Sequence, residues 1–134
     1  MQITRQADYA IRAVRYLSKL GADKRAATST VAREMKIPPS FLAKIVSQLS
    51  IAGLLNTSRG ARGGVMLARD AKDISLLDVV EAIDGPIQLN ECVDASGICS
   101  FEDDCPMKSV WCDAQADLVK TLKGTNFSDM MAKK

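Results

Sequence analysis

Histidine is absent from the 134 residues of this chain. Histidine is the commonest general base and the commonest neutral metal ligand in proteins, so its absence removes both roles. The sequence also contains no glycine-rich phosphate loop, no HExxH zinc motif and no GxSxG nucleophile motif. Nothing in the sequence therefore indicates an enzyme.

Long apolar runs are missing as well. A membrane-spanning helix needs about 18 consecutive apolar residues, and no run approaches that length. Residues 1–8 lack the long apolar stretch of a secretory signal. We expect a cytoplasmic protein with no membrane partner, whose four cysteines are reduced thiols or metal ligands rather than disulfides. The length, with 47% apolar and 25% charged residues, predicts one globular domain.

The net charge of +2 conceals opposite charges in the two halves of the chain. Residues 1–73 hold 13 Lys and Arg but 5 Asp and Glu, whereas residues 74–134 hold 5 and 11. The resulting charges of +8 and −6 make the first half a candidate surface for a polyanion. Solvated surface charge is the simpler interpretation of the same composition.

Apolar residues at helical spacing predict three helices in the basic half, over residues 5–20, Thr28–Met35 and Phe41 to about Ala52. Thr28 and Ser40 are expected to be the N-caps of the second and third helices, because their hydroxyls can accept from the first free N–H groups. Gly21 is a suitable stop for the first helix, and Pro38 separates the other two.

Two short strands, Leu54–Ser58 and Val65–Ala68, are predicted next, joined by a glycine-rich segment with two arginines. Three helices followed by a basic hairpin predict a mostly α fold with a small β-hairpin wing, a winged helix-turn-helix. In that fold, polar side chains of the third helix meet base edges, whereas cations and glycine backbone of the wing meet phosphates. Each element taken alone also fits an ordinary helix or hairpin. The residues expected to contact double-stranded DNA are Thr28, Ser40, Lys44, Ser47, Gln48, Arg59, Gly60, Arg62 and Gly63.

The acidic half predicts a helix from Ser75 to about Asp84, a long helix from Pro106 to about Lys123, and a tail over residues 124–134. The long helix carries an apolar stripe formed by Val110, Trp111, Ala114, Leu118 and Leu122. Because so small a chain has few elements to cover this stripe, we expect a homodimer in which the partner subunit covers it. Two recognition helices would then read half-sites about one helical turn apart.

Three of the four cysteines, Cys92, Cys99 and Cys105, lie close together in an aperiodic segment. Their spacing differs from that of zinc ribbons and ferredoxins, yet a loop can bring three thiolates to one iron–sulfur cluster or zinc ion. Simple packing as small apolar side chains is the alternative. Cys112 falls about 10 Å along the predicted helix from Cys105, so it is either a fourth ligand or a buried helix-face cysteine.

Several segments together resemble one known family, and they cover nearly the whole chain. They are residues 7–13 (ADYAIRA), 37–49, 53–55 (GLL), 59–64 (RGARGG), 67–68 and 83–86 (IDGP), with the three cysteines. This pattern resembles the Rrf-two family of bacterial winged-helix transcriptional regulators, in particular its IscR-, NsrR- and RirA-like members. The resemblance implies a DNA-binding regulator, most simply a repressor, that dimerises through crossed long helices.

The resemblance also implies an iron–sulfur cluster, held by Cys92, Cys99 and Cys105, that tunes promoter binding. IscR-like members complete a [2Fe–2S] site with a histidine three residues after the third cysteine, but here that position is Lys108. NsrR-like members complete a [4Fe–4S] site with an aspartate from the first helix of the other subunit, and Asp8 matches that position. The fourth ligand, Asp8 or Cys112, and the type of cluster are left open.

The predicted organisation is a DNA-binding region over residues 1–84, a cluster loop over 85–105 and a dimerisation helix with its tail over 106–134, all in one structural domain. Two other functions fit parts of the sequence. A thiol-redox or cluster-carrier protein with non-specific nucleic-acid binding explains the cysteines but not the wing. A zinc-containing regulator of the same fold differs only in its metal, so iron content separates it from the cluster hypothesis.

Overall fold

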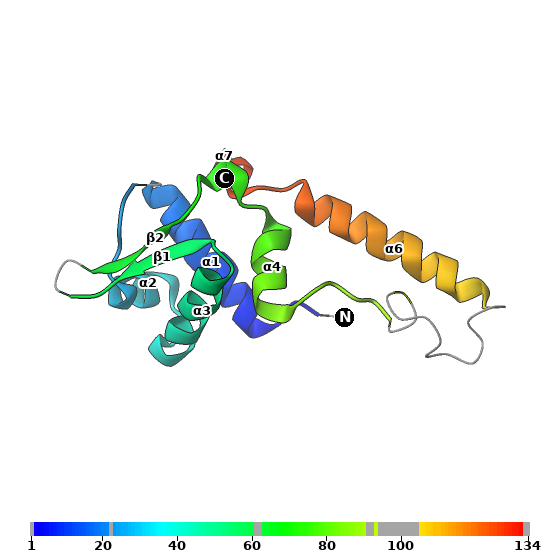
Figure 1. Cartoon of the computed structure of the whole chain (residues 1–134), viewed down its shortest axis with the longest axis horizontal. Coiled ribbons are helices and arrows are strands. Elements are labelled where there is room, and N and C mark those ends of the chain that lie inside the picture. The colour runs from blue at the N-terminus through cyan, green and yellow to red at the C-terminus, as the bar shows by residue number, and fades with distance from the viewer. Residues whose placement is uncertain (1, 22, 61–62, 91–92, 94–104, 133–134) are drawn as a thin grey trace.

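The computed structural model describes residues 2–21, 23–60, 63–90, 93 and 105–132. Its elements are α1 (Arg5–Leu20), α2 (Thr28–Met35), α3 (Pro39–Ile51), β1 (Leu55–Ser58), β2 (Gly64–Leu67), the short 3₁₀ helix η1 (Ala71–Asp73), α4 (Leu76–Asp84), α6 (Pro106–Lys123) and α7 (Phe127–Ala132). Figure 1 shows α1 to α4 and the hairpin gathered into one body, with α6 extending outward beyond α4, on the side opposite the hairpin. No helix in these ranges is both long enough and apolar enough to span a bilayer.

Helix α1 forms the centre of the body. The Thr4 hydroxyl caps it by accepting from the Ala7 N–H at 3.1 Å, and Gly21 ends it with a φ of +116° that favours glycine. One face is fully buried and packs against α2, α3, α4 and α7. The buried residues of that face are Ala7, Tyr9, Ala10, Ala13, Val14 and Leu17. The small alanines let the neighbouring helices approach closely, which explains why one helix can contact four others.

The helix-turn-helix differs from the prediction at the N-terminal ends of its two helices. Helix α2 covers the predicted range Thr28–Met35, whereas α3 begins before the predicted Phe41. Helix α2 has Ala27 as its N-cap and Thr28 as its first residue, and α3 has Pro38 as its N-cap. The predicted caps Thr28 and Ser40 are therefore wrong. Proline is favoured at the first helical position because its fixed φ suits the helix and its missing N–H is not needed there. For this reason α3 starts at Pro39, one residue before the hydroxyl that resembles a cap.

The hairpin pairs β1 with β2 in antiparallel register, from Leu55 opposite Leu67 to Ser58 opposite Gly64. A third segment joins this edge, because Ala26 and Val65 exchange backbone hydrogen bonds of 3.0 and 2.8 Å. Ala26 lies just before α2, so the wing is fixed beside the N-terminus of that helix.

The C-terminal residues that the structure describes are folded, which corrects the expected tail. Helix α7 packs onto α1 and η1, and Phe127 at its start is fully buried. The Leu76 N–H donates to the Thr125 carbonyl at 2.8 Å, and the Phe127 N–H donates to that of Ile74 at 3.1 Å. The end of the chain thereby closes the core beside α4, which begins with a capping box between Ser75 and Asp78.

Helix α6 lies on α4 over only part of its length. Its apolar residues Leu118, Val119 and Leu122 pack against the small cluster of Leu77, Val80 and Ile87. No residue of α6, all of which the structure describes, is fully buried. Met107 and Val110 toward its N-terminal end are 45% and 50% exposed. The C-terminal end of the predicted apolar stripe is thus covered within the chain, and the N-terminal end presents apolar side chains to the surface.

Candidate nucleic-acid interface and metal centre

The N-termini of α2 and α3 differ from those of α1 and α4. Helices α1 and α4 carry a side-chain cap and an acidic residue in the first turn, whereas α2 and α3 have neither. Their first N–H groups therefore lack an intramolecular side-chain partner and keep the positive end of the helix dipole uncompensated. Such helix termini bind anions, phosphate above all.

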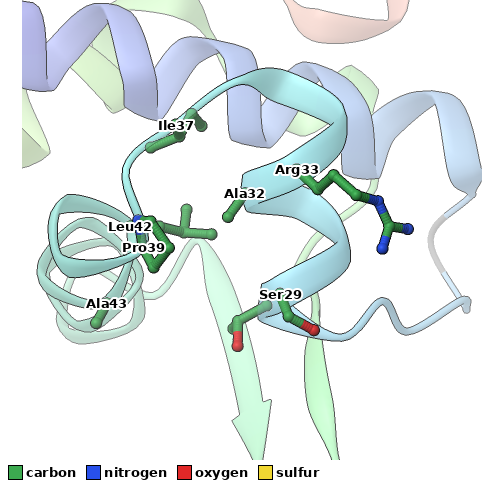
Figure 2. Close-up of a pocket in the computed structure, with 8 residues that line it drawn as sticks. Ser29, Ala32, Arg33, Ile37, Pro39, Leu42 and Ala43 are labelled. Atoms are coloured by element: carbon green, nitrogen blue, oxygen red, sulfur yellow. The ribbon is translucent and has the colours of Figure 1, made fainter.

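A pocket of about 330 Å³ separates these two N-termini. Figure 2 shows its apolar floor, to which α2 contributes Ala32, the turn contributes Ile37 and α3 contributes Leu42. Thr28 and Ser29 of α2 line its rim together with Pro39 and Ala43 of α3. Thr28, which sequence reasoning placed at the DNA, is exposed at this rim.

The outer face of α3 presents three of the predicted base-reading residues. Ser40, Lys44 and Ser47 are exposed, opposite a buried face formed by Leu42, Ile45, Val46 and Leu49. Gln48 is different, because it is half-buried and its Oε1 atom is buried with no hydrogen-bond partner among the described residues. This position argues against the predicted base contact of Gln48.

The wing presents Arg59 as an exposed cation. Arg62, the other arginine of the wing that is predicted to contact DNA, lies outside the described residues. Gly60 and Gly63 have intramolecular reasons to be glycine: Gly60 has a φ of +97°, and a Cβ on Gly63 would overlap the Ser58 carbonyl oxygen. A phosphate contact by their backbone stays a prediction.

Gly64 anchors the wing to the body, and its replacement tests this arrangement. Its φ is +151°, and an added Cβ would overlap the Ala26 carbonyl oxygen. We expect Gly64→Ala to lower the free energy of unfolding by about 1–3 kcal/mol beyond the backbone strain, as overpacking does. Gly60→Ala is the matched control, with positive φ but nothing within 4 Å of its Cβ. Equal urea midpoints for the two variants would contradict the close approach.

The cysteine segment begins from a fixed position and ends at the start of α6. Ile87 is buried against α6, and the Leu89 N–H donates to Oε1 of Gln115 at 2.9 Å. Cys105 is the N-cap of α6, half-buried and not in a disulfide. Cys92 and Cys99 lie outside the described residues, and within the described ranges no three Cys, Asp or Glu side chains converge on a metal site.

The two candidates for a fourth ligand lie in different surroundings. Cys112 is inside α6, seven residues and about 10 Å along the axis from Cys105, so the helix holds the two apart. The Asp8 side chain is 51% exposed and forms an ion pair with Arg12 at 2.8 Å. It lines an open pocket of about 880 Å³ at the N-terminal end of α1.

Sequence reasoning missed Arg12 and Phe41, which connect Asp8 to α3. The Arg12 guanidinium lies 5.3 Å from the centre of the Tyr9 ring, and one of its N–H groups donates to the Met35 carbonyl at a long 3.5 Å. The Tyr9 ring in turn contacts that of Phe41, with centroids 6.0 Å apart. The i,i+4 spacing of Asp8 and Arg12 was a signal for the ion pair. Nothing in the sequence pointed to Phe41.

Comparison with known proteins places this arrangement in one family. The family model Rrf2, described as an iron-dependent transcriptional regulator, matches residues 3–133. Protein aau3 of Rhizobium meliloti is 33% identical over 132 residues, which are 98% of this chain and 85% of that protein. The structure of T. potens IscR has a TM-score of 0.78 and 21% identity, over 98% of this chain and 87% of its own. CymR, the global cysteine regulator of B. subtilis, has a TM-score of 0.82 and 22% identity, over 100% and 98%. These likenesses confirm the predicted winged-helix fold.

Proposed function

This chain belongs to the Rrf2 (Rrf-two) family of iron-dependent transcriptional regulators, and on that premise we propose that it is a homodimeric repressor whose operator binding is tuned by an iron–sulfur cluster. Helix α3 enters the major groove, and the wing contacts the DNA backbone. Cys92, Cys99 and Cys105 hold the cluster. The family assignment alone does not specify the iron–sulfur cluster, the homodimer or repression rather than activation.

One observation carries the DNA-binding part of this proposal: two helix N-termini suited to bind anions, those of α2 and α3, lie next to each other and next to the wing. Neither α2 nor α3 has a side-chain cap or a first-turn acid. The Ala26–Val65 bridge fixes the hairpin beside α2. A DNA strand that crosses this face would meet free N–H groups, exposed hydroxyls and Arg59 in succession.

Replacement of Arg59 by alanine tests the wing contact. Because a phosphate contact carries no sequence information, we expect Arg59→Ala to weaken binding to all duplexes alike and to lower the slope of log K against log salt by about one. Fluorescence anisotropy at several salt concentrations measures both. Lys120→Ala removes an exposed cation from α6, a helix that Figure 1 shows apart from the hairpin, and should leave the slope unchanged. An unchanged slope in Arg59→Ala would rule out its phosphate contact.

The exposed end of α6 favours a homodimer. Met107 and Val110 remain about half exposed, although the same helix buries its other end on α4. In a dimer with two-fold symmetry the same patch of both subunits forms the interface. The exposed end of α6 would then pack against the α6 of the partner subunit. Such a dimer presents two copies of α3 to two half-sites.

Of the three proposed thiolate ligands the structure describes Cys105, and its position suits that role. Cys105 is a free thiol at the N-cap of α6, where the positive end of the helix dipole stabilises an anionic ligand. The rigid helix between Cys105 and Cys112 disfavours Cys112 as a ligand shared with Cys105. Asp8, half-exposed at the open pocket of α1, is the better fourth ligand, provided by the partner subunit's copy of α1. The cluster supplies a group that nitric oxide, oxygen or iron supply can change.

Arg12 links Asp8 to the DNA-binding helices. If Asp8 held iron, the Arg12 guanidinium would lose the 2.8 Å ion pair and would keep the Met35 carbonyl and the Tyr9 ring as neighbours. Met35 ends α2, and Tyr9 contacts Phe41 of α3. Two states of Asp8 therefore give Arg12 two sets of contacts, which is the differential interaction that a switch requires.

Paired variants distinguish the two candidates for the fourth ligand. We expect Asp8→Ala to lose the cluster mass, because one iron loses its protein ligand, whereas Cys112→Ala keeps it. Native mass spectrometry of protein purified without oxygen measures the cluster mass directly. Arg12→Gln removes the ion pair but no ligand and serves as the control. Loss of the cluster in Cys112→Ala, with retention in Asp8→Ala, would reverse the assignment.

A further inference from the structure

The outer face of α3 has an unusual composition for a helix that reads bases. Its exposed residues, all within the described part of the chain, are Pro39, Ser40, Ala43, Lys44, Ser47 and Ile51, and Phe41 at the edge is 41% exposed. Arg and Asn, which make bidentate contacts to guanine and adenine, and Asp and Glu, which accept from cytosine, are absent from this helix. With Oε1 of Gln48 buried, Lys44 is the one exposed side chain of α3 suited to a strong hydrogen bond to a base edge.

The remaining contacts available to this face are largely apolar. The C5 methyl of thymine is the apolar group of the major groove, and alanine and phenylalanine side chains contact it. Successive residues of a helix are about 100° apart around its axis. Ala43 therefore lies about 100° to one side of Lys44, and Phe41 lies about 60° to the other side. Ala43 lies on the side of α2, where it lines the pocket of Figure 2. Phe41 lies on the side of α1, against Tyr9.

Phe41 is held in place rather than free in solvent. Its ring is tilted by 58° to that of Tyr9, with 6.0 Å between centroids, and Tyr9 is only 8% exposed. A tilted aromatic pair at this separation is attractive. The ring therefore loses little conformational freedom on binding, so little binding free energy is lost in ordering it against a base.

We infer that α3 recognises thymine methyl groups with Ala43 and Phe41, on the two sides of a guanine that Lys44 contacts. This inference rests on the proposed DNA-binding function and specifies its target: half-sites in which thymines flank a guanine. The alternative is readout through the hydroxyls of Ser40 and Ser47, which tolerate every base.

The test begins with duplexes that the purified full-length protein selects from a random library. In the best duplex each thymine of a half-site is then replaced by deoxyuridine, which removes only the methyl group. We expect a loss of about fourfold in affinity at each contacted thymine, the factor that burial of one methyl represents. Replacement of the central guanine by 7-deazaguanine removes the N7 acceptor and should cost about tenfold. A thymine outside the half-sites is the control.

Variants assign each contact to a residue. Phe41→Ala and Ala43→Gly should each abolish the deoxyuridine effect at one position and leave the other intact, and Lys44→Ala should abolish the 7-deazaguanine effect. Lys120→Ala should change none of them. Specific binding with every deoxyuridine substitution within about 1.5-fold of the parent would overturn the inference and leave the proposed function standing. Failure to select any sequence would instead contradict the proposed function itself.

Discussion

Cys99→Ala is expected to eliminate the visible absorbance and the cluster mass of the anaerobically purified protein while the dimer stays folded. Under the proposed ligand set, three thiolates and one weaker carboxylate hold the iron. Loss of one thiolate leaves two thiolates and one carboxylate, which are too few strong protein ligands to hold the cluster even without oxygen. Visible absorbance, iron content and native mass measure the loss, and far-UV circular dichroism verifies the fold.

The wild-type protein provides the decisive comparison for this result. If the wild type contains iron and Cys99→Ala does not, the result supports an iron–sulfur cluster ligated by Cys99. Retained iron in the variant would remove Cys99 from the ligand set. Zinc in the wild type would instead indicate a zinc-containing regulator of the same fold, and a colourless dimer after anaerobic reconstitution would refute the cluster while leaving the DNA-binding face unaffected.

The helix boundaries were predicted correctly where one residue gives one unambiguous start or stop signal. Gly21 ends α1, Ser75 caps α4, and Pro106 begins α6, all as expected. The range of α2 was correct and only its N-cap was misplaced. The start of α3 was misplaced because two signals compete there: a hydroxyl before an apolar run favours an N-cap, but Pro39 at the first helical position moves the start upstream. The result changes the interpretation of Ser40, which is a surface residue of α3 rather than its cap.

The candidate site was predictable only where it depends on local periodicity. The i,i+3 and i,i+4 spacing correctly separated the exposed Lys44 and Ser47 from the buried Ile45 and Leu49. Gln48 lies at the edge of that pattern, where burial depends on neighbouring elements that the sequence does not show. Phe41 was missed for the same reason, because its contact with Tyr9 joins two helices that are 32 residues apart in the chain.

The sequence also showed no sign of the hydrogen bond that joins the start of α1 to the end of α4. The Thr4 hydroxyl caps α1 and donates to the Asp84 carboxylate at 2.6 Å, although 80 residues separate them. Asp84 is the last residue of α4, directly before the cysteine segment. The start of α1, which carries Asp8, is therefore tied to the point from which the cysteine segment leaves the body.

Phe127→Ala is expected to destabilise the folded chain severely. The ring is fully buried in the main core, against helix α1 and the η1 segment, in a region that the sequence suggested to be a tail. Deletion of a buried phenylalanine side chain costs about 3–5 kcal/mol, from lost transfer energy and the cavity left behind. Domains of this size are stable by about 5–15 kcal/mol, so the variant would lose a large share of the total. Urea denaturation followed by circular dichroism measures it.

Ile51→Ala is the matched control, since that side chain is apolar but 85% exposed at the end of α3. It should shift the unfolding free energy by no more than about 0.5 kcal/mol, as surface replacements do. If Phe127→Ala behaved in the same way, α7 would be a peripheral element rather than part of the core. A large effect would instead mean that residues 124–134 are required for the DNA-binding body to fold, because α7 packs against α1 at the centre of that body.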